Sequence, residues 1–255
     1  MFNTLIDRYQ IQEVIPDQIG KSGDEIYLLK NKHQNFYLKI SRNKEILSEI
    51  KAYSFLKNKV IVPQVFENIL GYDGRYYLLM SEIKGKMLHE LLKEDIDQTI
   101  RIYASSLKQL HHLPYENFPN KPDLHSIVED IEPRLNKIDI NDLEPITKER
   151  GLQKTYERLK ELFPKERDLV ICHGDFCMPN IIVNQDNVGF IDLGRSRIDD
   201  RYADIALALR SLKSNMEMIG QSYLPQHQEL FLKTYGINQF DHDKCEFYYL
   251  LDEFF

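Results

Sequence analysis

The sequence predicts an α+β fold of two lobes, a small β-rich N-lobe with one helix and a larger, mainly helical C-lobe. Short apolar runs separated by turn residues fill the N-terminal third, with a single helical stretch between them. Apolar residues then recur at helical spacing through most of the remaining chain. We therefore predict an N-lobe over residues 1–83 and a C-lobe over residues 84–255, with one β-hairpin in the C-lobe.

Two strand pairs and one helix make up the predicted N-lobe. Residues 25–29 and 35–40 flank a polar turn, and residues 62–70 and 75–80 flank a turn with two glycines. Between the pairs, residues 44–57 place apolar side chains on one face at helical spacing. The expected order is thus two strands, one helix and two further strands.

Amphipathic helices dominate the predicted C-lobe. Residues 96–110 carry apolar side chains at alternating intervals of four and three, which indicates a helix with one face on a core. The exception is residues 169–192, where residues 181–183 and 188–191 form a hairpin over a polar turn. Further helices are expected over residues 155–162, 202–212, 226–235 and 244–254.

Composition argues against several classes of protein. No apolar run approaches the roughly 20 residues that span a bilayer. The N-terminus lacks the features of a secretory signal, so we expect a cytoplasmic protein without membrane contact. Forty acidic against 33 basic residues give a net charge of −7, which disfavours nucleic acid and suits a cationic partner. We expect a monomer or a weak dimer.

The motif His173-Gly174-Asp175, followed by Asn180 and Asp192, carries the strongest chemical signal. Asn180 stands at the start of the predicted hairpin and Asp192 at its end. In kinases one carboxylate orients or deprotonates the acceptor hydroxyl, while an amide and a second carboxylate bind the magnesium ions of ATP. The alternative, that Asp175 caps a turn and Asp192 ends a strand, does not explain why all three occur in this order. The spacing therefore predicts a protein-kinase-like fold with a catalytic hairpin, catalytic Asp175, and Asn180 and Asp192 as metal ligands.

Lys39 lies within an apolar predicted strand. A lysine there protects an edge strand from aggregation or, in a kinase lobe, reaches the nucleotide phosphates beside a helix glutamate. Glu49 is the expected partner, and Glu45, one turn earlier, is the second candidate. The candidate phosphate loop is Gly20-Lys21-Ser22-Gly23, ahead of the first strand pair, which does not match the Walker P-loop pattern.

Other polar residues receive structural interpretations. Cys172 and Cys177, beside the motif, are interpreted as small buried side chains, because the chain has too few cysteines for a disulfide framework or a zinc site. His111-His112 is expected to cap a helix end or to lie on the surface. Asp204 is expected to begin a helix and to brace the catalytic loop.

With these residues placed, the chain resembles the aminoglycoside phosphotransferases, and among them the aminoglycoside 3'-phosphotransferases of bacterial antibiotic resistance. The likeness extends over nearly the full length. It is strongest in His173-Gly174-Asp175, Phe190-Ile191-Asp192-Leu193-Gly194-Arg195, Asp204-Ile205-Ala206, Arg210-Ser211 and the ending Leu250-Leu251-Asp252-Glu253-Phe254-Phe255. The resemblance implies a kinase-like fold, phosphorylation of the 3'-hydroxyl of an aminoglycoside, ATP or else GTP as donor, and Mg²⁺.

The same resemblance implies roles for individual residues. An aromatic ring would stack on adenine, hinge backbone groups would bond its edge, and a serine and an ion-paired lysine would contact the phosphates. The implied nucleotide-binding residues are Ser22, Tyr37, Lys39, Glu49, Ser81 and Ile83. Carboxylates would hold the ammonium groups of the drug through charge-assisted hydrogen bonds. The implied drug-binding residues are Glu144, Arg195, Asp252, Glu253 and the terminal carboxylate of Phe255.

Two other functions remain open from the sequence. The first is a kinase of the same fold that acts on another amino-alcohol or sugar, such as choline, a macrolide or a glycated amine. The second is a catalytically inactive pseudokinase that serves as a binding module. Intact Lys39, Asp175, Asn180 and Asp192 argue against the pseudokinase. A protein kinase is disfavoured because no Asp-Phe-Gly to Ala-Pro-Glu activation segment is recognisable.

Overall fold

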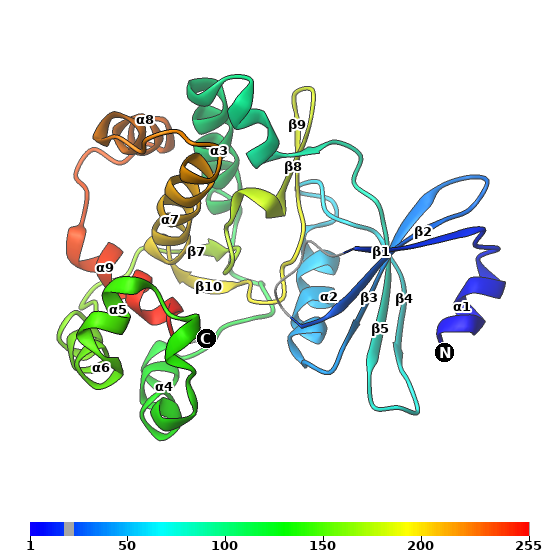
Figure 1. Ribbon diagram of the computed structural model, residues 1–255, viewed down its shortest axis with the longest axis horizontal. Coiled ribbons are helices and arrows are strands. Elements are labelled where there is room, and N and C mark those ends of the chain that lie inside the picture. The colour runs from blue at the N-terminus through cyan, green and yellow to red at the C-terminus, as the bar shows by residue number, and fades with distance from the viewer. Residues whose placement is uncertain (18–22, 255) are drawn as a thin grey trace. The chain divides into compact units, whose positions relative to one another are not determined.

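An antiparallel sheet of five strands forms the centre of the first of two units (Figure 1). This computed structural model describes residues 1–17 and 23–254. Unit 1 comprises Met1–Lys86 and Ile182–Arg195, and unit 2 comprises Met87–Ile181 and Ser196–Phe255. The segment Ile182–Arg195 thus clusters with the N-terminal part of the chain, although it lies within the range expected for the C-lobe.

Both predicted strand pairs are present in the sheet of unit 1, whose order is β1-β2-β3-β5-β4. The strands are β1 (Glu13–Asp17), β2 (Glu25–Lys30), β3 (Asn35–Ser41), β4 (Val65–Leu70) and β5 (Tyr76–Ser81). Strand β1 was not expected from the sequence, because Pro16 argues against a strand and is tolerated only at a sheet edge, where β1 lies. The seven-residue helix α1 (Phe2–Arg8) was also not expected, because it is too short to show periodicity.

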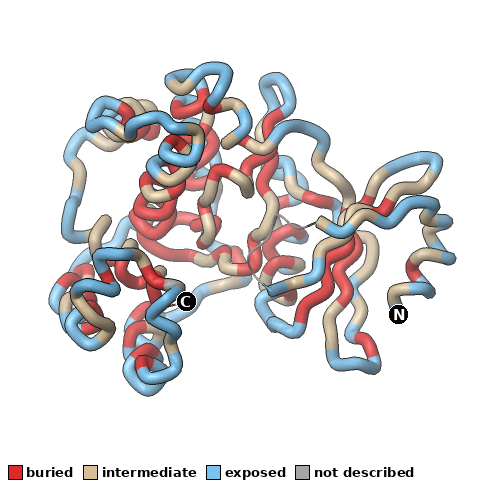
Figure 2. Tube along the Cα trace, viewed as in Figure 1, coloured by how far each residue is buried: buried red, intermediate tan, exposed pale blue. Residues whose placement is uncertain are grey.

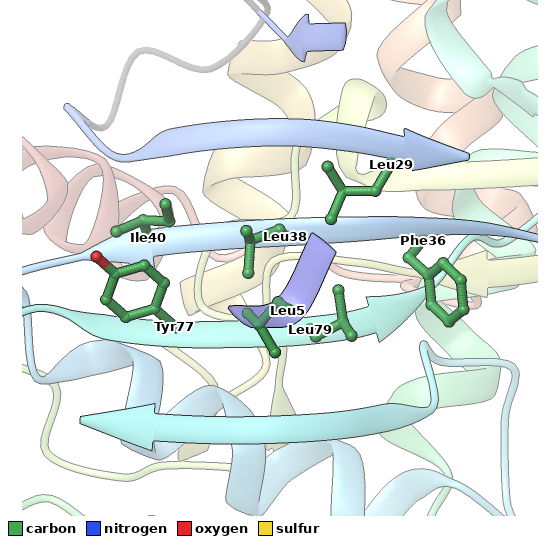
Figure 3. Packing of buried hydrophobic residues seen from close by; sticks show 7 residues of the cluster. All are labelled: Leu5, Leu29, Phe36, Leu38, Ile40, Tyr77 and Leu79. Atoms are coloured by element: carbon green, nitrogen blue, oxygen red, sulfur yellow. The ribbon is translucent and has the colours of Figure 1, made fainter. Parts of the chain in front are cut away.

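One face of this sheet forms an apolar core beneath α1 (Figure 3). Leu5 of α1 packs there against side chains from three strands, namely Leu29, Phe36, Leu38, Ile40, Tyr77 and Leu79. Successive side chains of a strand point to opposite faces. Because Leu38 and Ile40 of β3 face this core, Lys39 between them points to the other face of the sheet.

Helix α2 (Glu45–Leu56), the predicted helix of the N-lobe, buries Ile46, Glu49, Tyr53 and Leu56. The positions recur at intervals of three and four residues, so they lie on one helical face. A glutamate among them is exceptional, because a carboxylate is rarely fully buried without a partner. Its partner is described with the site below.

The predicted hairpin consists of β8 (Ile181–Asn184) and β9 (Asn187–Phe190). Within unit 1, the Phe190 N–H donates to the Ile61 carbonyl at 2.9 Å. A Cβ atom added to Gly189 would lie 3.0 to 3.1 Å from side-chain atoms of Ile83 and Ile61, so glycine permits this close approach. The approach fixes the end of β9, and Asp192 follows two residues later.

Unit 2 is mainly helical, as expected. Its helices are η1 (Leu88–Lys93), α3 (Ile96–His111), α4 (Leu124–Glu129), η2 (Glu132–Lys137), η3 (Ile140–Asp142), α5 (Pro145–Arg150), α6 (Leu152–Glu161), η4 (Met178–Asn180), α7 (Tyr202–Met218), α8 (Pro225–Tyr235) and α9 (His242–Asp252). Helix α3 packs against α8, and α7 packs against α9. Figure 2 shows α7 as largely buried, in agreement with its run of apolar side chains.

Strands β7 (Leu169–Cys172) and β10 (Arg197–Asp200) pair antiparallel in unit 2. Along the chain, the boundary between the units falls within the two-residue strand β6 (Lys86–Met87). The chain leaves β7 directly into the motif that begins at His173. Among the residues described, no helix has the length and apolarity needed to cross a membrane.

Candidate active site

Lys39 is the centre of a charged cluster in unit 1. Its ammonium nitrogen lies 3.1 Å from Oε2 of Glu49 and 2.9 Å from Oδ1 of Asp192. A third carboxylate, that of Asp24, lies 3.6 Å away. The structure therefore brings together three of the predicted residues, Lys39, Glu49 and Asp192, and adds Asp24.

Burial distinguishes the two glutamates that were candidates for the partner of Lys39. The side chains of Lys39 and Glu49 are 9% and 1% exposed, whereas Glu45 is exposed. Burial acts to lower the pKa of Lys39, but the Glu49 and Asp192 carboxylates raise it well above its usual value, so the ammonium stays charged. Glu49, and not the second candidate Glu45, is the partner of Lys39.

Tyr53 links the two carboxylates and was missed from the sequence, where it served only as an apolar position. Its hydroxyl donates to Oε1 of Glu49 at 2.7 Å and accepts the Asp192 N–H at 3.0 Å. Burial, together with the charge of Glu49, raises the pKa of Tyr53 well above its usual value. The hydroxyl therefore remains a donor to Glu49 throughout the physiological pH range.

Asp192 adopts a left-handed backbone conformation, with φ of +57°. Such a conformation is uncommon for a residue other than glycine, although aspartate tolerates it better than most. The bond to Tyr53 and the ion pair with Lys39 hold it there. Its side chain is 40% exposed, so the carboxylate also remains accessible to a ligand.

Asp175 and Asn180 form a second cluster, in unit 2. The Asn180 amide nitrogen donates to Oδ2 of Asp175 at 2.9 Å and to its carbonyl at 3.0 Å. The Cys177 thiol donates to the other carboxylate oxygen, Oδ1, at 2.9 Å. Both oxygens of Asp175 therefore have a fixed donor, which sets the plane of the carboxylate.

The loop that carries Asp175 is anchored to helices α3 and α7. Asp204 of α7 accepts the backbone N–H groups of His173 and Gly174, at 2.6 and 2.9 Å. The Tyr103 hydroxyl of α3 donates to the Phe176 carbonyl at 2.6 Å, and the two rings stack with centroids 4.8 Å apart. The expectation that Asp204 braces the loop is confirmed.

The expectation for His111 was wrong. His111 neither caps a helix nor lies on the surface; its side chain is 1% exposed and bonds to Asp204 and Tyr235. Helical periodicity places it on the buried face of α3, but the sequence does not show the acid, 93 positions away, that accepts its bond. Cys172 is buried as expected, and burial raises the pKa of its thiol well above the usual value.

The expected nucleotide residues occupy unit 1. Tyr37 is half-buried on β3, and burial raises the pKa of its hydroxyl. Ser81 ends β5, where its N–H donates to the Gln64 carbonyl at 2.9 Å, and Ile83 packs near Gly189. Ser22 lies outside the described residues.

Three of the expected drug-binding acids gather at the end of α9 in unit 2. Glu253 accepts the Glu144 N–H through Oε2 at 2.9 Å. Arg210 of α7 forms ion pairs with Asp252 and, at 3.5 Å, with Oε1 of Glu253. From the sequence, Arg210 was part of a matching motif only, and its ion pairs with these acids were not expected. Phe255 lies outside the described residues, and Arg195 belongs to unit 1, in the turn after Asp192.

The fold and these two clusters define the protein as an enzyme of the kinase-like phosphotransferase class, which transfers a phosphoryl group from a nucleotide to a hydroxyl. A protein-family model described as "Phosphotransferase enzyme family" matches residues 13–248. The chain belongs to that family.

The closely similar proteins carry related names. An aminoglycoside 3'-phosphotransferase from Niallia circulans is 34% identical, over 95% of this chain and 93% of that protein. The crystal structure of an aminoglycoside 3'-phosphotransferase of type VIII superposes with a TM-score of 0.82 at 26% identity, covering 100% of this chain and 97% of that one. The structure of an aminoglycoside phosphotransferase from Streptomyces rimosus, in complex with ADP and streptomycin, has a TM-score of 0.74 at 24% identity, covering 99% and 97% of the two chains.

Proposed function

We propose that this enzyme transfers the γ-phosphoryl group of ATP to the 3'-hydroxyl of aminoglycosides and thereby confers resistance to them. The family and the names of its relatives support the reaction class and the substrate. The observation that carries the proposal furthest is the Asp175 carboxylate, which is held by two donors on an anchored loop.

Asp175 is proposed as the catalytic residue. An ionised carboxylate offers about four lone-pair sites, and Cys177 and Asn180 occupy two of them. The others remain to accept the hydrogen bond of the attacking hydroxyl. Fixing the carboxylate plane before the substrate arrives reduces the entropy cost of aligning this hydroxyl with the phosphorus atom.

The nucleotide is proposed to bind unit 1. The charged Lys39, supported by Glu49, would contact the α- and β-phosphates, and Ser22 would add a hydroxyl donor. Tyr37 would stack on adenine, and backbone groups at Ser81 and Ile83 would bond its edge. Since the Ser81 N–H already donates within the sheet, the Ile83 backbone would contribute the N–H donor.

Asn180 and Asp192 are proposed as the ligands of Mg²⁺. Both side chains offer the oxygen atoms that this ion prefers. The bonds from Asn180 to Asp175 use the amide nitrogen, which directs the amide oxygen away from Asp175, and the Asp192 carboxylate is partly exposed. The bound ion would neutralise charge that develops on the phosphates.

The cationic drug is proposed to bind at the end of α9. Glu144, Asp252 and Glu253 supply negative charge there, and Arg195 and Phe255 are proposed as further drug-binding residues. Burial raises the pKa of Glu253, and Arg210 already pairs with two of the acids. The ammonium groups of the drug would therefore share these carboxylates with Arg210.

A matched pair of acceptors tests the proposal. Kanamycin B and its 3'-deoxy analogue tobramycin differ only in the proposed acceptor hydroxyl. We expect acceptor-dependent ADP release with kanamycin B and none with tobramycin, and ³¹P NMR should place the product phosphate at the 3' position. Expression of the enzyme should raise the kanamycin concentration that inhibits bacterial growth, whereas the Asp175→Ala variant should not.

Turnover of tobramycin at the same rate would remove the 3' assignment. Activity on choline, a macrolide or a glycated amine but on no aminoglycoside would favour the alternative kinase. Nucleotide binding without any transfer would favour a pseudokinase.

A further inference from the structure

A chain of buried hydrogen bonds runs from α8 through α3 and α7 to the loop of the catalytic residue. The Tyr235 hydroxyl lies 2.7 Å from Nδ1 of His111, and Nε2 of His111 lies 2.9 Å from Oδ2 of Asp204. Asp204 in turn accepts the backbone N–H groups of His173 and Gly174. All of these bonds lie within unit 2.

The chemistry of Asp204 fixes the direction of this chain. Burial acts to raise the pKa of its carboxyl, but the hydrogen bonds from His111 and from the Gly174 backbone hold that pKa below its usual value, so Asp204 is ionised and can only accept. Nε2 of His111 therefore carries the proton. Burial keeps the Tyr235 hydroxyl protonated, so it can donate to Nδ1. A hydrogen bond at one ring nitrogen selects which tautomer the ring presents at the other.

A metal site is the competing explanation for the same residues. Ligand atoms of His111, Cys172 and Asp204 lie within 4.8 Å of one another. The Cys172 thiol, however, lies 3.4 Å from the Asp200 carbonyl as a donor, and burial raises its pKa, which opposes the thiolate that a metal requires. Both ring nitrogens of His111 already have hydrogen-bond partners. The geometry favours a hydrogen-bonded support over a metal site.

The rotation of the Asp204 carboxylate sets the orientation of the peptide groups that precede Asp175. Its two oxygens accept consecutive N–H groups, and Gly174 has φ of +85°, which few residues other than glycine adopt. A third donor, from His111, fixes this rotation. We propose, building on the function proposed above, that His111 and Tyr235 are positioning residues for phosphoryl transfer that act through Asp204 on Asp175.

Variants that differ in one hydrogen bond test this inference. Tyr235→Phe retains the ring and removes only the hydroxyl, and His111→Leu removes the donor to Asp204. His111→Gln restores an N–H donor on a side chain of similar reach. His112→Ala is the matched control, because His112 is the exposed neighbour of His111.

We expect Tyr235→Phe to lower kcat about ten-fold, the equivalent of one lost hydrogen bond, and His111→Leu to lower it about a hundred-fold. The KM for ATP should stay within about two-fold, because the nucleotide residues belong to unit 1. His111→Gln should recover part of kcat, and His112→Ala should match the wild type. In NMR spectra the Gly174 amide proton, downfield when it bonds a carboxylate, should move upfield in Tyr235→Phe and further in His111→Leu.

Unchanged kcat in both variants, or thermal destabilisation without a shift of the Gly174 amide, would overturn the inference. Tight binding of Zn²⁺ to the wild type that His111→Leu abolishes would also overturn it, in favour of the metal site. The amide shift is measured without an acceptor. If no aminoglycoside is phosphorylated, the function proposed above fails while the amide shift still decides whether His111 and Tyr235 position the loop.

Discussion

The ion pair of Lys39 and Glu49 provides a quantitative test of the nucleotide site. We predict that Lys39→Met lowers the free energy of unfolding by about 3–5 kcal/mol and abolishes phosphoryl transfer. The stability loss arises because Glu49 is 1% exposed and would remain as a buried charge without its cation.

The magnitude follows from the geometry. Coulomb's law gives about 5 kcal/mol for the 3.1 Å pair at an effective dielectric constant of about 20. The ion pair with Asp192 adds less than its 2.9 Å separation implies, since that side chain is 40% exposed and solvent screens it. The hydrogen bond from Tyr53 to Glu49 remains in the variant and reduces the loss in the free energy of unfolding.

The double variant Lys39→Met/Glu49→Leu separates stability from function. It removes both charges and replaces them with apolar side chains of similar volume, so no uncompensated charge remains. We expect its free energy of unfolding to return to within about 1–2 kcal/mol of the wild type, the residual loss being the Glu49 acceptor of Tyr53. It should remain inactive, because no cation would contact the phosphates.

Urea unfolding without nucleotide, followed by far-UV circular dichroism and by the fluorescence of the 15 tyrosines, measures both effects in a chain without tryptophan. ADP release in the presence of kanamycin measures the activity. A Lys39→Met protein within about 1 kcal/mol of the wild type would refute the argument from the buried charge. A double variant with wild-type turnover would refute the role of Lys39 in nucleotide binding.

Other variants test the drug site, the loop and the helix α3. Asp252→Asn should raise the KM for kanamycin about 10- to 100-fold with the KM for ATP unchanged, since it weakens charge-assisted bonds to the drug; an equal rise in both constants would contradict this role. Asp204 has a pKa below its ordinary value of 3.8, so its ionised form stabilises the fold above that pH and this share is lost as the pH falls through the folded-state value. The stability deficit of Asp204→Asn, measured by urea unfolding, should therefore stay constant above about pH 5 and shrink as the pH falls below about 4, and a deficit that stays constant in acid would count against the linkage. Asp95→Ala should cost about 1 kcal/mol, because its side chain caps α3 by accepting the Gln98 N–H, whereas Asp97→Ala, in the same exposed turn, should cost less than half as much in the same unfolding experiment.

Most secondary structure was accessible from the sequence, because periodicity and turn chemistry act over a few residues. The strand pairs β2–β3 and β4–β5, the helices α2 and α3, and the hairpin β8–β9 were expected within a few positions. The elements that were missed include α1, β1, α4, α5 and β10, all of which are short. Helix α1 packs on one face of the sheet, and β1 pairs at its edge, so tertiary contacts stabilise both.

The sequence predicted the main residues of the candidate site but not all of their partners. Motif spacing selected Asp175, Asn180 and Asp192, and the position of a lysine in an apolar strand selected Lys39. In the structure Asp175 bonds to Asn180 in unit 2, and Lys39 pairs with Asp192 in unit 1. The interpretation of His111 as a cap or surface residue failed, because its partner Asp204 lies 93 positions away. Helical periodicity indicates which face of a helix is buried, but it does not identify the side chain that contacts a residue on that face.

The sequence by itself therefore determined the class of chemistry, because phosphoryl transfer requires a few side chains in a fixed order along a loop and a hairpin. Tertiary structure alone decided the partners. Lys39 pairs with Glu49 and not with Glu45, and Tyr53 bonds to both Glu49 and Asp192. Arg210 pairs with Asp252 and Glu253. The physical reason is that burial and hydrogen bonding depend on distances in space, and the Lys39–Asp192 bond, for example, joins residues 153 positions apart.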